Sequence, residues 1–272
     1  MAFTPNSHTE VSDFLRKRKD LPLHISGNDA DRHAEDTISL SKLNSVVLYE
    51  PEEMIISVGS GIPLTKLENI LVAKGQWIPT LCADESLEQT LGAAIAMDHF
   101  HPRSLSSGAL RTTILGGTFC TTSGEIFKSG SRVVKSVAGY DIHRSFCGSQ
   151  GRFGVILDLT LKVQPRPEEF FRFLAPLDSK QRLVLFHPTC LEEFDGKLLV
   201  EFAGYSEDVS YDRELLKSEI MMVEELSDSE WVGSVRKMIL LRDAGRKAVL
   251  SPVAQELLMN VRKVFDPKGV LV

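Results

Sequence analysis

The sequence predicts an α+β fold, and three observations support this prediction. Two short strand patterns precede one helix pattern between residues 46 and 75, whereas a doubly wound sheet needs strands and helices in regular alternation. Between residues 170 and 241, three strand patterns come before two helix patterns. The 272 residues are 43% hydrophobic and 25% charged, a globular composition that excludes wholesale disorder.

Charge and apolar run lengths exclude several functional classes. The chain has 31 Lys and Arg against 37 Asp and Glu, and this net charge of −6 does not suit a nucleic-acid binder. No apolar run approaches the roughly 20 residues of a transmembrane helix, and residues 1–20 carry charges where a signal peptide is apolar. We therefore expect a cytoplasmic protein, with membrane association only through a partner. Four widely spaced cysteines are expected to be buried small hydrophobes: Cys82, Cys120, Cys147 and Cys190.

The first 75 residues contain strand and helix patterns with clear boundaries. A helix pattern covers residues 14–19, and strand patterns cover 23–25, 46–49 and 54–58, with turn formers at 26–30 and 50–53. Pro63 is expected to be the first residue of a helix, and Lys74-Gly75 is expected to end it. The predicted buried face of that helix consists of Leu64, Leu67, Ile70 and Leu71.

The middle of the chain ends at a proline-rich segment that predicts a domain boundary. Residues 114–127 predict two strands joined at 122–125, and residues 141–147 predict one or two helical turns capped by Asp141. A partly alternating strand over 153–163 ends at Pro165-Arg166-Pro167.

The remaining 105 residues predict a small open sheet covered by helices on one face. Strands are expected at 170–174, 183–186 and 198–202, and helices at 208–221 and 227–241. A last helix is expected to begin at Ser251-Pro252 and to stop at Asp266-Pro267, with Leu257, Val261 and Val264 on its buried side.

Three glycine-bearing stretches are candidates for binding a ligand through the main chain. They cover residues 26–30, residues 90–96, and residues 135–141 together with 148–156. Successive amides in such turns can bind phosphate, and small side chains let a ring approach the backbone. The G-x-x-G-x-x-G pattern of the third stretch precedes a strand, so the Rossmann context fails, and no Gly-Lys-Ser/Thr completes a Walker loop. An ordinary turn and tight helix packing remain alternatives for the first two stretches.

The third stretch resembles a known family. Residues 135–141 (K-S-V-A-G-Y-D) with 148–156 (G-S-Q-G-R-F-G-V-I) are similar to the flavin domain of the vanillyl-alcohol oxidase/para-cresol methylhydroxylase superfamily, and are most similar to the FAD-binding subunits of glycolate oxidases. Further matches are Gly59-Ser60-Gly61, residues 75–79, Thr90-Leu91-Gly92, Gly108 with Arg111, Leu115-Gly116 and the terminal segment 265–271.

The resemblance implies a two-lobed FAD-binding domain and a small α+β cap. The domain would cover residues 1–167, with lobes of about 1–76 and 77–167; the cap would cover 168–250, and 251–272 would return to the domain. It also implies non-covalent FAD and a set of cofactor-binding residues: Ser26, Gly27, Asn28, Asp29, Pro79, Thr90, Leu91, Gly92, Ala93, Ala96, Gly108, Arg111, Val137, Ala138, Gly139, Tyr140, Asp141, Gly148, Gly151, Val155 and Ile156.

The family's chemistry implies a substrate and a partner. A small 2-hydroxy acid such as glycolate or D-lactate would lose a hydride to the flavin, and the electrons would leave through an iron–sulfur subunit. No metal site is expected. The sequence selects no catalytic residue.

Several residues depart from the family's pattern. Gly27 is followed by Asn28 and Asp29 where the family has further glycines, and a carboxylate beside a diphosphate is unfavourable. Residues 97–102 are bulky where the family has a small turn; His99 and His101 there are candidate proton-transfer groups, but we expect them to be surface histidines. Candidate groups to bind a substrate carboxylate in the cap are Arg172, Arg182 and His187.

These departures leave a second hypothesis open. The chain is either a catalytic FAD subunit or a degenerate structural or assembly subunit that has lost FAD. A generic α+β enzyme that uses another nucleotide is a third, less favoured, interpretation.

Overall fold

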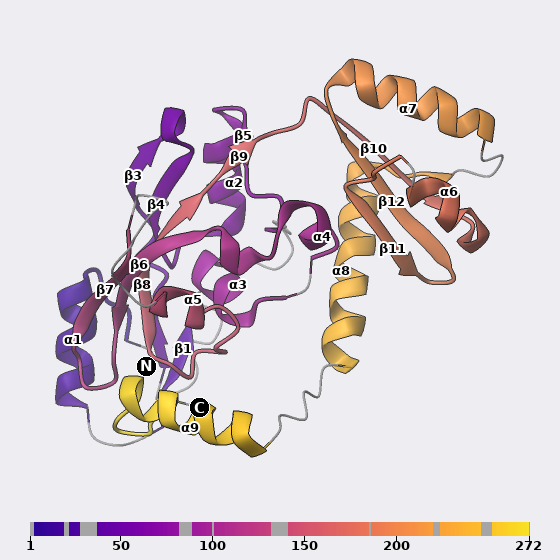
Figure 1. Cartoon of the computed structure of the whole chain (residues 1–272). Helices are drawn as coiled ribbons and strands as arrows, with labels where there is room; N and C mark the ends of the chain where they lie inside the picture. Colours follow the sequence, from indigo (N-terminus) through magenta and orange to yellow (C-terminus); the bar gives the residue numbers. More distant parts are fainter. Residues whose placement is uncertain are drawn as a thin grey trace. The chain divides into compact units, whose positions relative to one another are not determined.

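The computed structural model describes residues 3–18, 22–27, 37–81, 89–99, 101–131, 141–184, 186–219, 224–245 and 252–271 (Figure 1). The chain divides into two compact units, and each is described by itself. Unit 1 comprises Met1–His99, Leu110–Gln164 and Ala248–Val272, and unit 2 comprises Phe100–Ala109 and Pro165–Lys247. Both units combine helices with strands, which confirms the predicted α+β class.

An antiparallel sheet forms the centre of unit 1 (Figure 1). Its strands, in spatial order, are β3 (Val46–Glu50), β4 (Ile55–Gly59), β8 (Val155–Lys162), β6 (Ile114–Cys120) and β7 (Ile126–Gly130). The strands expected at 46–49, 54–58, 153–163 and within 114–127 are thereby confirmed, with ends shifted by a few residues.

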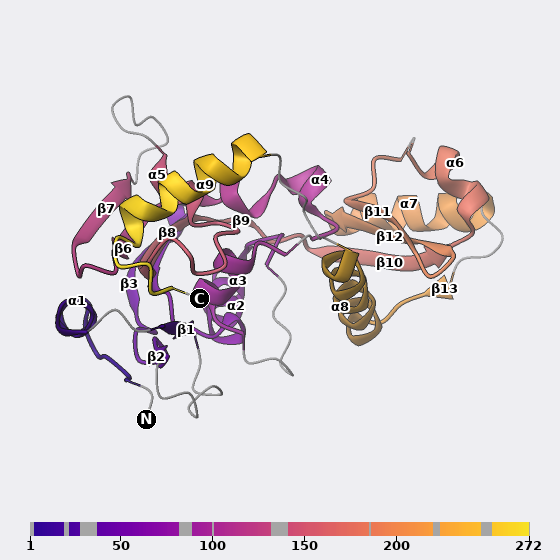
Figure 2. The same cartoon turned by 90° about the horizontal axis from the view of Figure 1, so that it is seen from below.

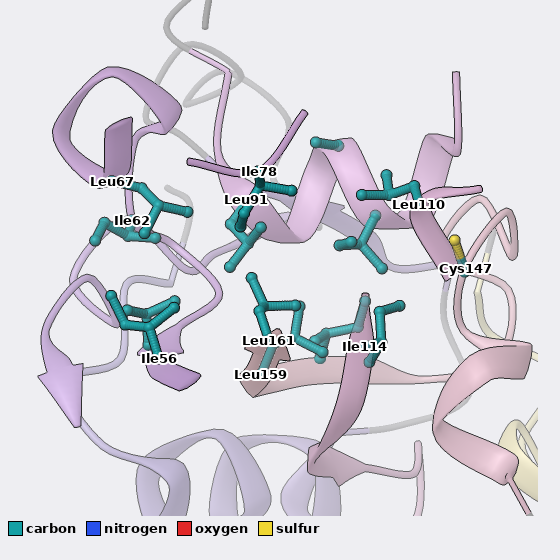
Figure 3. Packing of buried hydrophobic residues seen from close by; sticks show 14 of the residues in the cluster. Ile56, Ile62, Leu67, Ile78, Leu91, Leu110, Ile114, Cys147, Leu159 and Leu161 are labelled. Carbon is teal, nitrogen blue, oxygen red and sulfur yellow. The ribbon is translucent and has the colours of Figure 1, made fainter. Parts of the chain in front are cut away.

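The core of unit 1 lies on both faces of this sheet. Leu157 of β8 belongs to one hydrophobic cluster, whereas Leu159 and Leu161 belong to the other, which is the cluster shown in Figure 3. A regular strand would place all three on one face, because side chains alternate with a period of two. A register shift pairs Thr118 with Asp158 but Phe119 with Ile156, so the alternation changes phase at Leu157. This bulge explains why the sequence of β8 alternates only in part.

Helices and short strands complete unit 1. α2 (Leu64–Val72) and α3 (Leu91–Met97) contribute Leu67 and Leu91 to the cluster shown in Figure 3. The other elements are α1 (His8–Lys17), β1 (His24–Ser26), which pairs in parallel with β2 (Thr37–Ser39), and β5 (Gln76–Trp77), α5 (Ile142–Ser145), β9 (Gln164–Pro165) and α9 (Pro252–Phe265).

Two predicted helix starts were wrong, for local reasons. α1 begins at His8 and not near Phe14, because the Ser7 hydroxyl accepts the Glu10 N–H at 3.2 Å and the Glu10 carboxylate accepts the Asn6 N–H at 2.8 Å. Such reciprocal capping fixes a helix N-terminus. Pro63 is not the first residue of α2 but its N-cap, with an extended ψ of 139°.

The predicted buried side of α9 was also wrong. Leu257 and Val264 are exposed, whereas Leu258, Val261 and Phe265 pack against the core of unit 1. The Phe265 ring stacks on Phe127 of β7 at a centroid distance of 5.7 Å. The start of the helix at Pro252 agrees with the prediction.

Unit 2 is an antiparallel sheet with helices packed against it (Figures 1 and 2). The strand order is β11 (Cys190–Phe194), β12 (Lys197–Gly204), β10 (Glu169–Ala175) and β13 (Glu224–Glu225). The helices are α4 (Ser104–Ser107), α6 (Lys180–Val184), α7 (Ser206–Glu219) and α8 (Asp228–Gly245). Phe173 of β10 packs toward α7, while Leu199 of β12 packs with Trp231 of α8.

The strand expected at 183–186 was wrong, and a strand was missed. Leu183 lies in the helix α6 and is fully buried in a hydrophobic cluster of unit 2. A short apolar run fits the periodicity of a strand as well as that of a helix, and the strand was predicted in error. The missed strand β11 is joined to β12 by Asp195 and Gly196, both at positive φ. An Asp-Gly pair between strands is typical of a tight hairpin turn.

The exposed position Gly233, inside α8, offers a test of the fold of unit 2. A Cβ added at Gly233 would meet no atom within 4 Å. We expect Gly233→Ala to raise the free energy of unfolding by about 0.5–1 kcal/mol, since alanine loses less backbone entropy in a helix. Urea unfolding followed by circular dichroism measures this change; a destabilised variant would contradict the placement of this residue in an exposed helix interior.

Candidate functional site

The described parts of the three glycine-bearing stretches, residues 26–27, 90–96 and 148–156, converge in unit 1. A Cβ atom on Gly27, which follows β1, would lie 1.9 Å from Thr90 Oγ1 at the start of α3. At the other end of α3, the Gln150 N–H donates to the Ala96 carbonyl at 2.8 Å. A Cβ on Gly151 would lie 3.9 Å from Ile25 Cδ1 in β1, so the turn that contains Gly151 lies next to β1 as well as next to α3.

The helix α3 at the centre of this site has two different sides. Its large side chains, Leu91 and Ile95, are buried in the core. Gly92, Ala93 and Ala96 are only half-buried. The Gly92 N–H donates to the Ser60 carbonyl at 2.7 Å, which ties the helix to the turn after β4. Gly92 packs closely against this turn, because an added Cβ would lie 3.0 Å from Ser60 Cβ, whereas Ala93 and Ala96 keep part of their surface exposed.

The glycines of the 148–154 turn are required by the fold itself. Gly148, Gly151 and Gly154 have φ values of +78°, +75° and +120°, a region that side-chain-bearing residues rarely adopt. A Cβ on Gly154 would also lie 2.6 Å from the Cys120 carbonyl oxygen. These glycines alone therefore do not indicate a ligand.

Two buried hydroxyl groups at this site do indicate a bound ligand. Thr90 is 3% exposed and Ser149 is 7% exposed. Neither Thr90 Oγ1 nor Ser149 Oγ has a hydrogen-bond partner in the part of the chain that the structure describes. Buried polar groups are nearly always paired, so an unpaired hydroxyl suits a bound polar group. Thr90 and Ser149 lie at the two contacts that join α3 to the glycine-bearing loops.

A charged pair lies at the C-terminal end of α3, and the thiol of Cys147 lies beside it. Asp98 has a left-handed φ of 44°, and its carboxylate is 3.2 Å from Arg111 Nη2. The arginine offsets a carboxylate at a helix C-terminus, where the helix dipole disfavours negative charge. Burial, followed by the nearby Asp98 carboxylate, raises the pKa of the Cys147 thiol to about 12. Cys147 is therefore a protonated thiol near neutral pH.

Unit 2 contains a buried ion cluster centred on Glu201, which is 0% exposed. Arg103 binds both carboxylate oxygens, with Nε–Oε1 and Nη2–Oε2 distances of 2.6 and 2.5 Å. Arg172 Nε donates to Glu201 Oε2 at 2.8 Å, and the Thr189 hydroxyl donates to Oε1 at 3.1 Å. Burial opposes the charge of Glu201, but the two arginines outweigh this and lower its pKa. The sequence prediction missed this cluster, although a lone Glu in the apolar strand β12 is its signal.

His101 lies beside this cluster and not on the surface. It is 2% exposed, so the expectation of a surface histidine was wrong for this residue. Its Nδ1 accepts the backbone N–H of Arg103 at 3.2 Å. The neighbouring His99 is half-buried.

The other predicted residues for binding a carboxylate are not gathered at one site. Arg172 is already bound to Glu201, and its Nη1 contacts the Asp228 carboxylate. Arg182 lies in α6, and its side chain is outside what the structure describes. His187 is exposed in the loop after α6, at a φ of 51°.

Comparison with known families identifies the domain. Residues 1–130 match the family described as "FAD binding domain". Over these residues the chain is similar to the FAD binding domain of the para-cresol methylhydroxylase type. The predicted family resemblance is confirmed, and the convergent stretch around Thr90 lies inside the matched residues.

Two relatives extend the similarity beyond the FAD binding domain. The chain is 30% identical over 211 residues to "Glycolate oxidase subunit GlcE" of Escherichia coli (strain K12), a match that covers 73% of this chain and 60% of that protein. It is 27% identical over 192 residues to "D-lactate dehydrogenase" of Anaerostipes hadrus, covering 67% of this chain and 40% of that protein. The chain thus spans about half the length of the relatives it matches.

A solved structure shows the same fold. An alkyldihydroxyacetonephosphate synthase superposes with a TM-score of 0.66 at 16% sequence identity, covering 98% of this chain and 74% of that one. This level of identity supports the fold alone.

The structure places the remaining predicted FAD residues in varied surroundings. Pro79 is buried after β5, and Gly108 lies in unit 2 at a φ of +85°. Val155 and Ile156 are the first two residues of β8, and each packs into one of the two core clusters of unit 1. Asp141 is the N-cap of α5, as predicted, although its side chain pairs with Arg144 at 3.2 Å and makes no capping hydrogen bond. The residues outside the described part are Asn28, Asp29, Val137, Ala138, Gly139 and Tyr140.

Three cysteines behave as predicted. Cys120, Cys147 and Cys190 are buried, whereas Cys82 lies outside the described residues. Within the described ranges, no helix is both long enough and apolar enough to cross a membrane.

Proposed function

We propose that the chain is the FAD-binding subunit of an oxidoreductase that acts on a small 2-hydroxy acid of the glycolate or D-lactate type. The observation that carries this proposal is the similarity to a glycolate oxidase subunit and to a D-lactate dehydrogenase. Both names denote removal of two electrons from a carbon that bears a hydroxyl next to a carboxylate. When bound, the flavin supplies the hydride acceptor.

The convergent stretches of unit 1 would hold FAD. The hydroxyls of Thr90 and Ser149 are buried and unpaired among the described residues, so each would gain a partner from a phosphate or ribityl oxygen. The small, half-buried side chains of Ala93 and Ala96 would let the cofactor approach the main chain of α3 closely. We propose that this FAD is held without a covalent bond.

The electrons would leave through a second subunit. The relative with 30% identity is named as a subunit, which supports a complex of more than one chain. We propose an iron–sulfur subunit as the electron acceptor and a cytoplasmic location for the complex.

Anaerobic reduction of the FAD-loaded chain tests the proposed reaction. We expect glycolate or D-lactate to bleach the blue absorbance of the bound flavin, because hydride transfer needs no electron acceptor beyond FAD. Acetate has the carboxylate but no hydroxyl and serves as the control that leaves the spectrum unchanged. If FAD binds but no 2-hydroxy acid bleaches it, the chain is not a catalytic subunit of this kind. If FAD does not bind, the hypothesis of a degenerate structural subunit is favoured.

A further inference from the structure

The segment 266–271, which follows α9, pairs with the chain that leads into the candidate FAD site. Leu271 forms a parallel bridge with Leu23, and the Leu23 N–H donates to the Val270 carbonyl at 2.8 Å. All three residues are buried and belong to the same hydrophobic cluster of unit 1. Leu23 directly precedes β1, and Gly27 directly follows it. The segment 266–271 therefore holds the chain four positions before Gly27.

β1 is short and has a neighbour on each edge. It contains three residues, which pair in parallel with the three residues of β2. Backbone groups of successive residues in a strand point to opposite edges, so the Leu23 N–H and the Ser26 carbonyl face opposite ways. The Ser26 carbonyl accepts the Leu40 N–H at 2.9 Å on the β2 side, whereas the Leu23 N–H is bound to Val270. Because two isolated strands of this length are only marginally stable, the segment 266–271 contributes to the position of β1.

A buried carboxylate holds the segment in this pairing. The Asp266 side chain is 0% exposed. Its Oδ1 accepts the Val270 N–H at 3.0 Å, and its Oδ2 accepts the Leu271 N–H at 3.1 Å. Arg262 of α9 donates to Asp266 Oδ2 at 3.4 Å and also to the Leu271 carbonyl. A buried carboxylate is unfavourable without such partners, so Asp266 favours the conformation in which the chain turns back toward it.

The position of β1 in turn sets a contact of the candidate FAD site. A Cβ on Gly27 would lie 1.9 Å from Thr90 Oγ1, so the chain after β1 closely approaches the start of α3. Thr90 Oγ1 is one of the two buried hydroxyls that have no partner among the described residues and that we propose bind FAD. A shift of β1 would change this approach, although no residue of the segment 266–271 needs to touch the cofactor.

We propose that the segment 266–271, anchored by Asp266, is a positioning element of the FAD site, and that its pairing with Leu23 is coupled to FAD binding. This inference rests on the FAD site of the proposed function and is independent of the substrate. Coupling between two equilibria is reciprocal. If the pairing strengthens FAD binding by a given factor, bound FAD must disfavour the opening of the pairing by the same factor.

FAD affinity of the full chain tests one direction of the coupling. Asp266→Asn keeps the shape of the side chain but turns an amide N–H₂ group toward backbone N–H donors, so one of them loses its acceptor. We expect its FAD affinity to fall about threefold to tenfold, the equivalent of one hydrogen bond. Tyr49→Phe is the matched control: it removes the 2.7 Å hydrogen bond from Tyr49 to Gln76 Oε1, between β3 and β5 of the same unit. It should leave the FAD affinity within about twofold of the wild type, because stability lost elsewhere in a folded chain does not change the site.

Hydrogen exchange of the wild type tests the other direction and needs no variant. Under native conditions, saturating FAD should slow exchange at least about threefold at two amides of the pairing. These are the Leu23 N–H, bound to the Val270 carbonyl, and the Leu271 N–H, bound to the Asp266 carboxylate. The Met54 N–H, which donates to the Pro51 carbonyl at 3.0 Å in the turn before β4, is the control and should exchange at the same rate with and without FAD.

The outcomes separate this inference from the FAD assignment. A wild type that binds FAD without slower exchange at Leu23 and Leu271 would overturn the inference, and the flavin site would stand. A folded Asp266→Asn variant with the FAD affinity of the wild type would also overturn it, as would an equal loss of affinity in Tyr49→Phe. A wild type that takes up no FAD would contradict the flavin assignment itself, and the inference would fall with it.

Discussion

Glu201→Gln is expected to lower the free energy of unfolding of unit 2 by about 3–5 kcal/mol. The substitution keeps the shape of the side chain but removes the buried negative charge that Arg103 and Arg172 share, and Arg172 keeps only the exposed Asp228 carboxylate. The amide also turns an N–H₂ group toward guanidinium donors, so at least one donor loses its acceptor. This loss is a large fraction of the stability of a typical domain.

The pH dependence of unfolding identifies the carboxylate as the cause. The two arginines lower the pKa of Glu201 in the folded chain, so its contribution is present above the unfolded pKa, near about 4.3, and is lost as the pH falls through the folded value. Urea unfolding at several pH values should show this acid loss in the wild type and less of it in Glu201→Gln. Glu193→Gln, in the exposed pair with Lys180, is the matched control and should leave the urea midpoint unchanged at neutral pH. Equal effects of the two substitutions at neutral pH would contradict the central role of Glu201.

Gly27→Ala is expected to weaken FAD binding by about tenfold to hundredfold, since overpacking of this kind costs about 1–3 kcal/mol. The new Cβ would lie 1.9 Å from Thr90 Oγ1 and 3.0 Å from Thr90 Cβ, so turning the threonine side chain does not remove the overlap. The loop after β1 must then move away from α3. Equilibrium titration with FAD, followed by flavin fluorescence, measures the change.

A double-mutant cycle isolates the steric cause. Thr90→Ala removes the hydroxyl and should itself weaken FAD binding, because an unpaired donor no longer gains a phosphate or ribityl partner. Adding Gly27→Ala to Thr90→Ala should cost less than Gly27→Ala alone, because the atom nearest to the new Cβ is gone. Additive effects would show that the loop and α3 do not meet as the structure places them. Gly233→Ala, which contacts nothing within 4 Å, is the control that leaves FAD affinity unchanged.

Local patterns were sufficient to predict most elements of unit 1. Apolar spacing located α2 through Leu64, Leu67 and Leu71, and the strands β3 and β4 follow from short apolar runs bounded by turn formers. Two errors concern signals that the sequence does contain. The spacing of Ser7 and Glu10 is a capping box, and Asp195-Gly196 is a hairpin signal.

Other features depend on contacts between distant residues, and local sequence patterns signal them only weakly. In β12, the alternation of Leu198, Val200 and Phe202 predicts one buried face, but only the tertiary structure shows that Glu201 on the opposite face is also buried. The burial of His101 has the same origin, because Arg103, two residues along, binds Glu201 far away in the sequence.

Some features of the candidate FAD site were predicted from the sequence, and others are seen only in the structure. Family resemblance selected the stretches around Gly27, Thr90 and Gly148, and the structure brings them together. The positive φ angles of the 148–154 turn show that the backbone conformation itself requires its glycines. The unpaired hydroxyls of Thr90 and Ser149 are visible only once burial and partners are known.

The stoichiometry of FAD uptake tests the central claim most directly. The full chain, stripped of any bound flavin, is titrated with FAD, and the absorbance spectrum and the amount retained after gel filtration are recorded. We predict a yellow protein that retains one FAD per chain, with the flavin released intact on denaturation because it is not covalently bound. A folded chain that stays colourless at saturating FAD would contradict the assignment of the Thr90 region as a flavin site.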